Sequence, residues 1–148
     1  MDLYRERLWP TPWLFITTLL ILPGVILVFA PINMSAGIIL AIALYAAVAL
    51  FFIFATKSIR VVDGEFRAGR ARIPLEFIGT PEAFTREQAA LQRGQQLDAR
   101  AWILLRGGID AVVKVPILDS SDPTPYWLVS TRHPKRLVSV LTQTSDVH

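Results

Sequence analysis

Few side chains in this sequence could carry acid–base, nucleophilic or metal chemistry. The 148 residues include two histidines and no cysteine, which excludes disulfides, thiolate catalysis and cysteine-ligated metal ions. His133 stands between an arginine and a proline, a placement typical of the start of a helix, and His148 is the last residue. We therefore expect His133 to serve at a helix cap rather than as a general base.

Serine and aspartate side chains offer little more. Residues 120–122, two serines and an aspartate, lie in a proline-rich turn, and turn formation explains them. Asp98, Asp110 and Asp119 could approach a magnesium ion, but no motif spacing recommends it. The pair Gly107–Gly108 lacks the residues that complete a phosphate-binding loop. The sequence thus predicts a protein that is not an enzyme and needs no cofactor or metal.

Arginines around an expected hairpin could bind phosphate groups. Arg67, Arg70 and Arg72 bracket this hairpin, and Lys57 and Arg60 precede it. If these side chains share a face, they would attract lipid headgroups or an acidic partner. The alternative is scattered surface charge, offset by three acidic neighbours: Asp63, Glu65 and Glu76.

Aromatic residues provide candidate contacts for a partner protein. Tyr126 and Trp127 follow a proline-rich loop, where a rigid ring would suit an interface. Because successive strand residues face opposite ways, at least one ring is expected in the core. The N-terminal segment adds four partner-binding candidates: Tyr4, Glu6, Arg7 and Trp9. We expect Glu6 and Arg7 to pair with each other, with the C-terminal domain or with a partner.

Two apolar stretches, Trp13–Ala30 and Ala36–Ala55, must hold these side chains at a membrane. Neither contains Asp, Glu, Lys, Arg or His, and as helices they reach roughly 27–30 Å, the thickness of the hydrocarbon core. The short loop 31–35 joins them into a hairpin of two transmembrane helices. The pair Pro23–Gly24 predicts a kink in the first helix.

The flanking charges predict how the hairpin is oriented. Arg5 and Arg7 precede the first stretch, Lys57 and Arg60 follow the second, and the loop is uncharged. By the positive-inside rule, both termini lie in the cytoplasm. The alternative is a cleaved signal peptide, but the cleavage site would be poor and a second span follows closely. We expect a protein of the cytoplasmic membrane.

The second stretch is rich in small residues, which would let another helix approach closely. Either the first span or a larger membrane partner could occupy this face, and the sequence favours neither. The small residues are Ala36, Gly37, Ala41, Ala43, Ala46, Ala47 and Ala49.

The polar tail, residues 56–148, is large enough for one compact domain, while residues 1–12 are expected to form a separate cytoplasmic segment. The mild basic excess of residues 56–148 is weaker than a nucleic-acid-binding surface requires, which argues against a nucleic-acid partner. Such an excess suits a domain beside an anionic membrane.

The tail reads as strands with two helices. The turn Asp63–Gly64 predicts a hairpin, a capping box at residues 85–88 opens a helix that Gly94 ends, and a final helix begins near Pro134. Five or six antiparallel strands closed by this helix predict an α+β roll or small barrel. The further strands are expected over residues 70–78, 101–105, 111–118 and 126–130.

This order of elements resembles the pleckstrin-homology-like domains of bacterial membrane proteins, which typically follow a two-helix hairpin. The resemblance rests on three segments: Ile59–Gly64, Ile73–Ile78 and Leu128–Leu137. It implies an antiparallel roll with a C-terminal helix. The segment Pro81–Leu97 is longer than the usual connection in such domains.

Two motifs extend a resemblance over almost the whole chain. Tyr4-x-Glu6-Arg7-Leu8 with the following Pro12-Trp13, and the late run from Asp122 to Arg132, are similar to a family of small actinobacterial membrane proteins. Its members are classed only as a domain of unknown function. The resemblance implies an actinobacterial cell-membrane protein and assigns no catalytic residue or ligand.

Together these features predict a non-enzymatic, membrane-anchored interaction module, an accessory subunit or scaffold of a larger cytoplasmic-membrane complex. Its partners would be a larger integral membrane protein and membrane lipids. The alternative function is a sensor of lipid headgroups or of a soluble ligand, which would bind through Arg67, Arg70 and Arg72.

Overall fold

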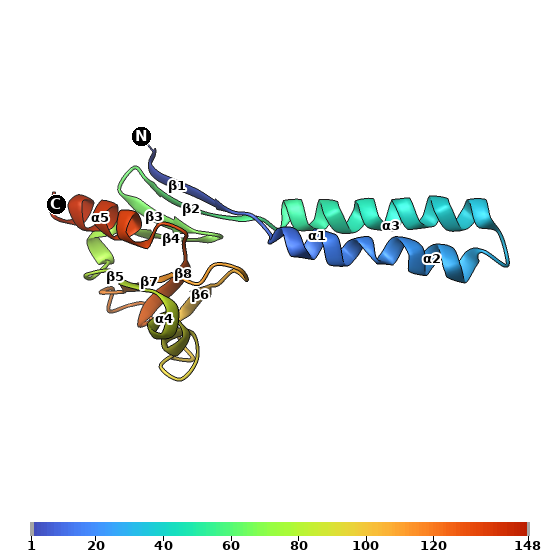
Figure 1. Cartoon of the computed structure of the whole chain (residues 1–148). Helices are drawn as coiled ribbons and strands as arrows, with labels where there is room; N and C mark the ends of the chain where they lie inside the picture. The colour runs from blue at the N-terminus through green and yellow to red at the C-terminus, as the bar shows by residue number, and fades with distance from the viewer. Residues whose placement is uncertain (1, 148) are drawn as a thin grey trace. The chain divides into compact units, whose positions relative to one another are not determined.

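The structure is a computed structural model that describes residues 2–147 (Figure 1). The chain divides into two compact units. The helical unit is Trp9–Thr56, and the β unit combines the segments before and after it, through Leu8 and from Lys57. The expected separate segment 1–12 is therefore corrected: its first part belongs to the same folded unit as the tail.

The helical unit contains α1 (Pro12–Leu19), α2 (Ile21–Phe29) and α3 (Met34–Phe54). Pro12–Phe29 and Met34–Phe54 are long and apolar enough to cross a membrane, with mean hydropathies of 2.3 and 2.7. The first of these helical segments is interrupted at Leu20, between α1 and α2 and about one turn before Pro23. Proline has no N–H to offer the carbonyl of the residue four positions earlier, so this interruption agrees with the predicted kink.

Close packing of α2 on α3 uses two of the seven small residues of α3. Gly37 and Ala41 are buried, and a Cβ added at Gly37 would lie 2.8 Å from the Cβ of Phe29. Asn33 caps α3, because its Oδ1 accepts a hydrogen bond from the Ala36 backbone at 3.1 Å. Four small residues remain exposed on α3: Ala36, Ala43, Ala46 and Ala47.

The first sheet of the β unit is an antiparallel meander in the order β1-β2-β3-β4. Its strands are β1 (Asp2–Leu8), β2 (Lys57–Val62), β3 (Glu65–Ala68) and β4 (Ala71–Pro74). The predicted hairpin is confirmed: Asp63 and Gly64 both have positive φ, 51° and 76°, as a two-residue turn between twisted strands requires. At the other end of β2, Leu8 and Lys57 are register partners.

The second sheet has the order β5-β7-β8-β6, and β6 runs parallel to β8. Its strands are β5 (Glu82–Phe84), β6 (Trp102–Leu104), β7 (Val112–Pro116) and β8 (Tyr126–Ser130). The helices of the β unit are η1 (Leu75–Phe77), α4 (Arg86–Arg93) and α5 (Pro134–Ser145). The structure therefore corrects the expectation of five or six antiparallel strands, since residues 2–147 form eight strands and the pair β6–β8 is parallel. The strand expected over residues 70–78 ends at Pro74 and continues as η1.

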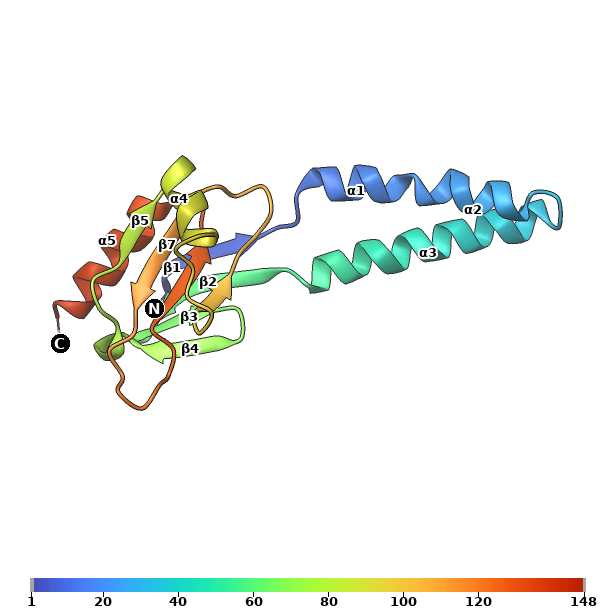
Figure 2. The same cartoon turned by 90° about the horizontal axis from the view of Figure 1, so that it is seen from below.

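The core lies between the two sheets and under α5. Alternate residues of the first sheet point into it, among them Ile59, Val61 and Phe66, each with no exposed surface. Leu137 and Leu141 of α5 complete the same cluster. Figure 2 shows α5 beside β5 and β7, the strands it contacts together with η1 and β1. Because one face of the first sheet supplies the core, the side chains of its other face point away from the core.

Candidate functional site: an arginine row on the first sheet

On the outer face of the first sheet, one arginine from each of the four strands stands at the same register position. Arg5 faces Arg60, Arg60 faces Arg67, and Arg67 faces Arg72 as register partners. Register partners point to the same side of a sheet. Neighbouring strands lie about 4.8 Å apart, so the four Cα atoms span roughly 14 Å. We call these four residues the arginine row.

The alternation of buried residues places the row outside the core. In β2 and β3, the residues adjacent to these arginines are buried, and side chains along a strand alternate between faces. Arg5, Arg67 and Arg72 are exposed, and Arg60 is half-buried. The row is therefore a surface feature built by strand register.

Most of the charge in the row has no counter-ion in the structure. Arg67 forms an ion pair with Glu65, at 2.8 Å between Nη2 and Oε2, supported by a hydrogen bond from Nε at 3.0 Å. Within residues 2–147, Arg5, Arg60 and Arg72 form no ion pair, and the buried Nε of Arg60 has no hydrogen-bond partner. Like charges in direct register destabilise a strand pair, so this face favours a bound anion.

The predicted phosphate-binding group is only partly brought together. Arg67 and Arg72 are direct neighbours in the row, whereas Arg70 lies exposed in the turn between β3 and β4. Arg5 was not among the predicted headgroup-binding residues. It precedes the helical unit in the sequence, whereas the other three arginines of the row follow that unit. The available signal was the alternation of Tyr4, Glu6 and Leu8 with Arg5 and Arg7, which the interpretation of these charges as the flank of a transmembrane helix masked.

A buried carboxylate fastens β1 to the start of α5. Glu6 is 8 % exposed, and its Oε2 accepts hydrogen bonds from the Tyr4 hydroxyl at 2.6 Å and from the Thr131 hydroxyl. Its Oε1 accepts the backbone N–H of Arg132 at 2.9 Å. We call these four residues the Glu6 junction. Of the three alternatives considered for Glu6, the structure shows contacts with the C-terminal domain.

The surroundings of Tyr4 follow from the same contacts. Burial, and next the hydrogen bond to Glu6, raise the pKa of the Tyr4 hydroxyl above its ordinary value. Tyr4 and Glu6 both face the interior, so the prediction that they lie on a partner surface is corrected: their side chains hold β1 in place. Arg7 and Trp9 are exposed, and they stay candidates for partner binding.

Both rings of the pair Tyr126–Trp127 are buried, at 7 % and 5 % exposure. The expected exposed aromatic contact is therefore wrong. The strand β8 lies between β7 and β6, with the first sheet over one face and residues around α4 over the other. The Tyr126 hydroxyl accepts the Asp98 N–H at 2.8 Å, and the Trp127 ring centroid lies 5.6 Å from that of Phe66.

The residues considered for catalysis have structural contacts. His133 is the N-cap residue of α5, but its side chain makes no capping hydrogen bond; its backbone N–H donates to the Thr131 hydroxyl at 3.1 Å. Ser121 donates its N–H and its hydroxyl to Asp119, and the hydroxyl bond lowers the pKa of that carboxyl. No cluster of three or more His or acidic residues suited to a metal ion occurs among residues 2–147. His148 lies outside the described residues.

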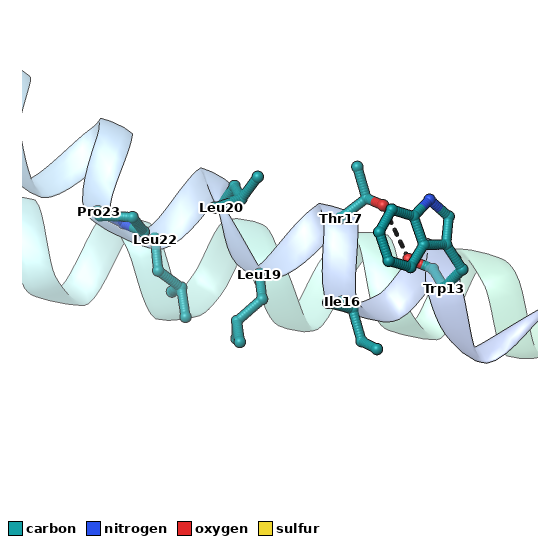
Figure 3. Close-up of a pocket in the computed structure, with 7 residues that line it drawn as sticks. All are labelled: Trp13, Ile16, Thr17, Leu19, Leu20, Leu22 and Pro23. Carbon is teal, nitrogen blue, oxygen red and sulfur yellow. Dashed lines mark hydrogen bonds between the residues drawn. The ribbon is translucent and has the colours of Figure 1, made fainter.

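The helical unit has a groove of about 540 Å³ on α1 and the start of α2, between Trp13 and Pro23 (Figure 3). Its lining is apolar except for Thr17, whose hydroxyl donates to the Trp13 carbonyl of its own helix at 2.8 Å. The groove therefore offers contact area to lipid or to another helix, without a free polar group for chemistry.

Comparison with known proteins gives a family and no annotated relative. A family model described as "Protein of unknown function (DUF3093)" matches residues 3–141, from β1 into α5. No curated protein and no solved structure matches the chain significantly.

Proposed function

The chain belongs to the DUF3093 family, whose function is unknown, and we propose that it is a non-enzymatic, membrane-anchored interaction module. In this proposal it acts as an accessory subunit or scaffold of a larger complex in the cytoplasmic membrane. The observation that carries the proposal is the insertion of the helical unit between two paired strands. β1 leads into α1, α3 leads into β2, and Leu8 faces Lys57 where both connections start.

This insertion supports a hairpin topology independently of the charge pattern. Since β1 and β2 are hydrogen-bonded neighbours, the start of α1 and the end of α3 must lie on the same side of any membrane that the helices cross. All 15 Lys and Arg and all 12 Asp and Glu residues lie outside Trp9–Thr56. The positive-inside rule then favours two spans with both termini in the cytoplasm.

The exposed face of α3 supports a role as an accessory subunit. Gly37 and Ala41 are buried, and a Cβ added at Gly37 would meet Phe29 of α2, whereas Ala36, Ala43 and Ala47 remain exposed. Their spacing of seven and four residues places these three on one helix face. A face of small residues lets the backbone of a partner helix approach closely in a bilayer. We propose that a transmembrane helix of the larger subunit packs here.

The β unit is then the part that faces the cytoplasmic side of the complex. A pleckstrin-homology-like relationship and an actinobacterial origin remain parts of this proposal, supported by the sequence motifs. Two four-stranded sheets followed by a C-terminal helix are compatible with such a roll. Arg7 and Trp9 are the N-terminal residues that stay accessible for partner contact.

Affinity purification from native membranes in mild detergent, followed by mass spectrometry, tests this function. We expect a stoichiometric integral membrane partner that is lost in an Ala43→Leu/Ala47→Leu variant. The matched control is Val28→Phe, which adds bulk at an exposed position of α2 and should retain the partner. A lone chain or a homo-oligomer in several gentle detergents would contradict the proposal.

A second role is favoured by a separate observation. The arginine row is a concentrated basic face on a domain tied to the helical unit by two short connections. Such a face suits anionic headgroups.

A further inference from the structure

We propose that the arginine row binds the phosphate groups of anionic lipids in the leaflet that borders the β unit. Arg5 and Arg60 form the centre of this site, and Arg72 extends it across the sheet. The inference concerns the β unit and does not depend on whether α3 binds a partner subunit.

Strand register supplies the geometry of the site. Arg5 and Arg60 are direct register partners on β1 and β2, and the Cα atoms of such partners lie about 4.5–5.5 Å apart. Two guanidinium groups that start this close can converge on one phosphate. Each presents a planar fork of N–H donors that matches a pair of phosphate oxygens.

The charges on this face favour a bound anion. Three of the four arginines form no ion pair among the described residues, and the fourth is held by Glu65. The whole chain has a formal net charge of only +3, so four arginines in register on one face are a strong local departure from the average. A phosphate placed between Arg5 and Arg60 removes the repulsion between these register partners.

The unpartnered donor of Arg60 gives a second and independent indication. Its Nε is buried and has no hydrogen-bond acceptor within residues 2–147. A buried donor without an acceptor costs free energy, and in native structures such a donor is usually satisfied by water, an ion or a ligand. A phosphate oxygen on the row would be the missing acceptor.

Chain connectivity selects lipid over other phosphate-bearing ligands. Residues 9–11 connect β1 to α1 and residues 55–56 connect α3 to β2, and Arg60 follows the last residue of α3 by six positions. At a maximum of about 3.5 Å per residue, Arg60 lies within roughly 21 Å of the helix end. Headgroups of the anchoring bilayer are thus present at high effective concentration, as for any tethered pair of binding partners.

Lipid titration of the purified full-length chain tests the proposal. The chain is kept in a non-ionic detergent, phosphatidylglycerol or phosphatidylcholine is added, and bound lipid is counted by native mass spectrometry. We expect tighter binding of phosphatidylglycerol, with an affinity that falls as salt is raised. Loss of two basic residues in Arg5→Gln/Arg60→Gln should weaken this binding by roughly 30-fold.

A charge-matched control separates the row from net charge. Arg86→Gln/Lys135→Gln removes two exposed charges outside the first sheet and should bind phosphatidylglycerol like the wild type. Thermal unfolding shows whether each variant folds, and Arg72→Gln provides a milder second variant of the row. Equal affinity for both lipids, or equal losses in the row and control variants, would overturn the proposal.

Competition identifies the source of the phosphate. Inorganic phosphate at millimolar concentration should not displace the lipid; if it does, the row is a site for a soluble anion and the lipid assignment is wrong. The Arg5→Gln/Arg60→Gln variant could instead lose a co-purified protein while its lipid binding stays unchanged. That result would also overturn the lipid proposal and would show that the row binds an acidic protein surface. The partner test on α3 leaves the row intact, so the two proposals fail separately.

Discussion

Leu8 and Lys57 face each other as register partners, although the entire helical unit separates them in the sequence. The same sheet contains a close parallel, because Val62 and Glu65 are register partners joined by the two-residue turn Asp63–Gly64. The helical unit therefore occupies the position of a hairpin loop. This equivalence indicates how the β unit can be separated from the helical unit.

Replacing Trp9–Thr56 with Asp-Gly should give a soluble, folded β unit. The turn would close β1 on β2 with the geometry already present at Asp63–Gly64. We expect a monomer with cooperative unfolding, measured by size exclusion and by circular dichroism during urea denaturation. A chain that begins at Lys57 is the control, and it should be poorly folded because it lacks β1 and leaves the partners of Glu6 exposed. Equal stability of the two chains would contradict the role given to β1.

Glu6→Gln should destabilise the β unit by about 1–3 kcal/mol, the cost of leaving a buried hydrogen-bonding group unsatisfied. The carboxylate accepts three hydrogen bonds, and an amide would turn one of its two acceptor atoms into a donor that faces other donors. Urea unfolding of the soluble β unit measures the change. Arg5→Gln, on the exposed face of the same strand, should change the unfolding free energy by less than about 0.5 kcal/mol. A similar loss in both variants would contradict the Glu6 junction.

Tyr4 should make stability fall at alkaline pH. Because the pKa of its hydroxyl is raised in the folded state, the folded chain holds this proton above pH 10 while the unfolded chain releases it. Stability is therefore fully present below the unfolded pKa, near 10, and declines as pH rises above it, by up to about 1.4 kcal/mol per pH unit. Comparing unfolding of the wild type and Tyr4→Phe between pH 9 and 11 isolates this contribution. Parallel pH profiles for the two proteins would show that Tyr4 does not cause the decline.

Gly37→Val should force α2 and α3 apart. A Cβ at this position meets the Cβ of Phe29 at 2.8 Å, and overpacking of this kind costs about 1–3 kcal/mol. The natural absence of cysteine allows two introduced cysteines, one on each helix, to carry spin labels for a distance measurement. Gly24→Val is the control, since nothing lies within 4 Å of a Cβ added there. An unchanged distance in Gly37→Val would contradict the close approach.

Local signals predicted much of the fold. The apolar stretches, the Asp63–Gly64 turn and the strand Tyr126–Ser130 appear where their residues indicated. The β1 strand was missed because its partner is distant in the sequence and its charges resemble a membrane flank. The arginine row depends on that pairing, so adjacent residues alone do not reveal it. The burial of both Tyr126 and Trp127 likewise depends on which strands cover β8, a property of the tertiary fold.

The insertion of the helical unit also sets an order of events during synthesis. The strand β1 leaves the ribosome first, and Trp9–Thr56 must follow before β2 is made, a delay of roughly 2–10 s at 5–20 residues per second. If the start of α1 and the end of α3 lay on opposite sides of a membrane, β1 and β2 could not meet, and the first sheet could not form. In the proposed membrane topology, completion of the β unit therefore requires that both of its connections to the helices lie on one side of the membrane.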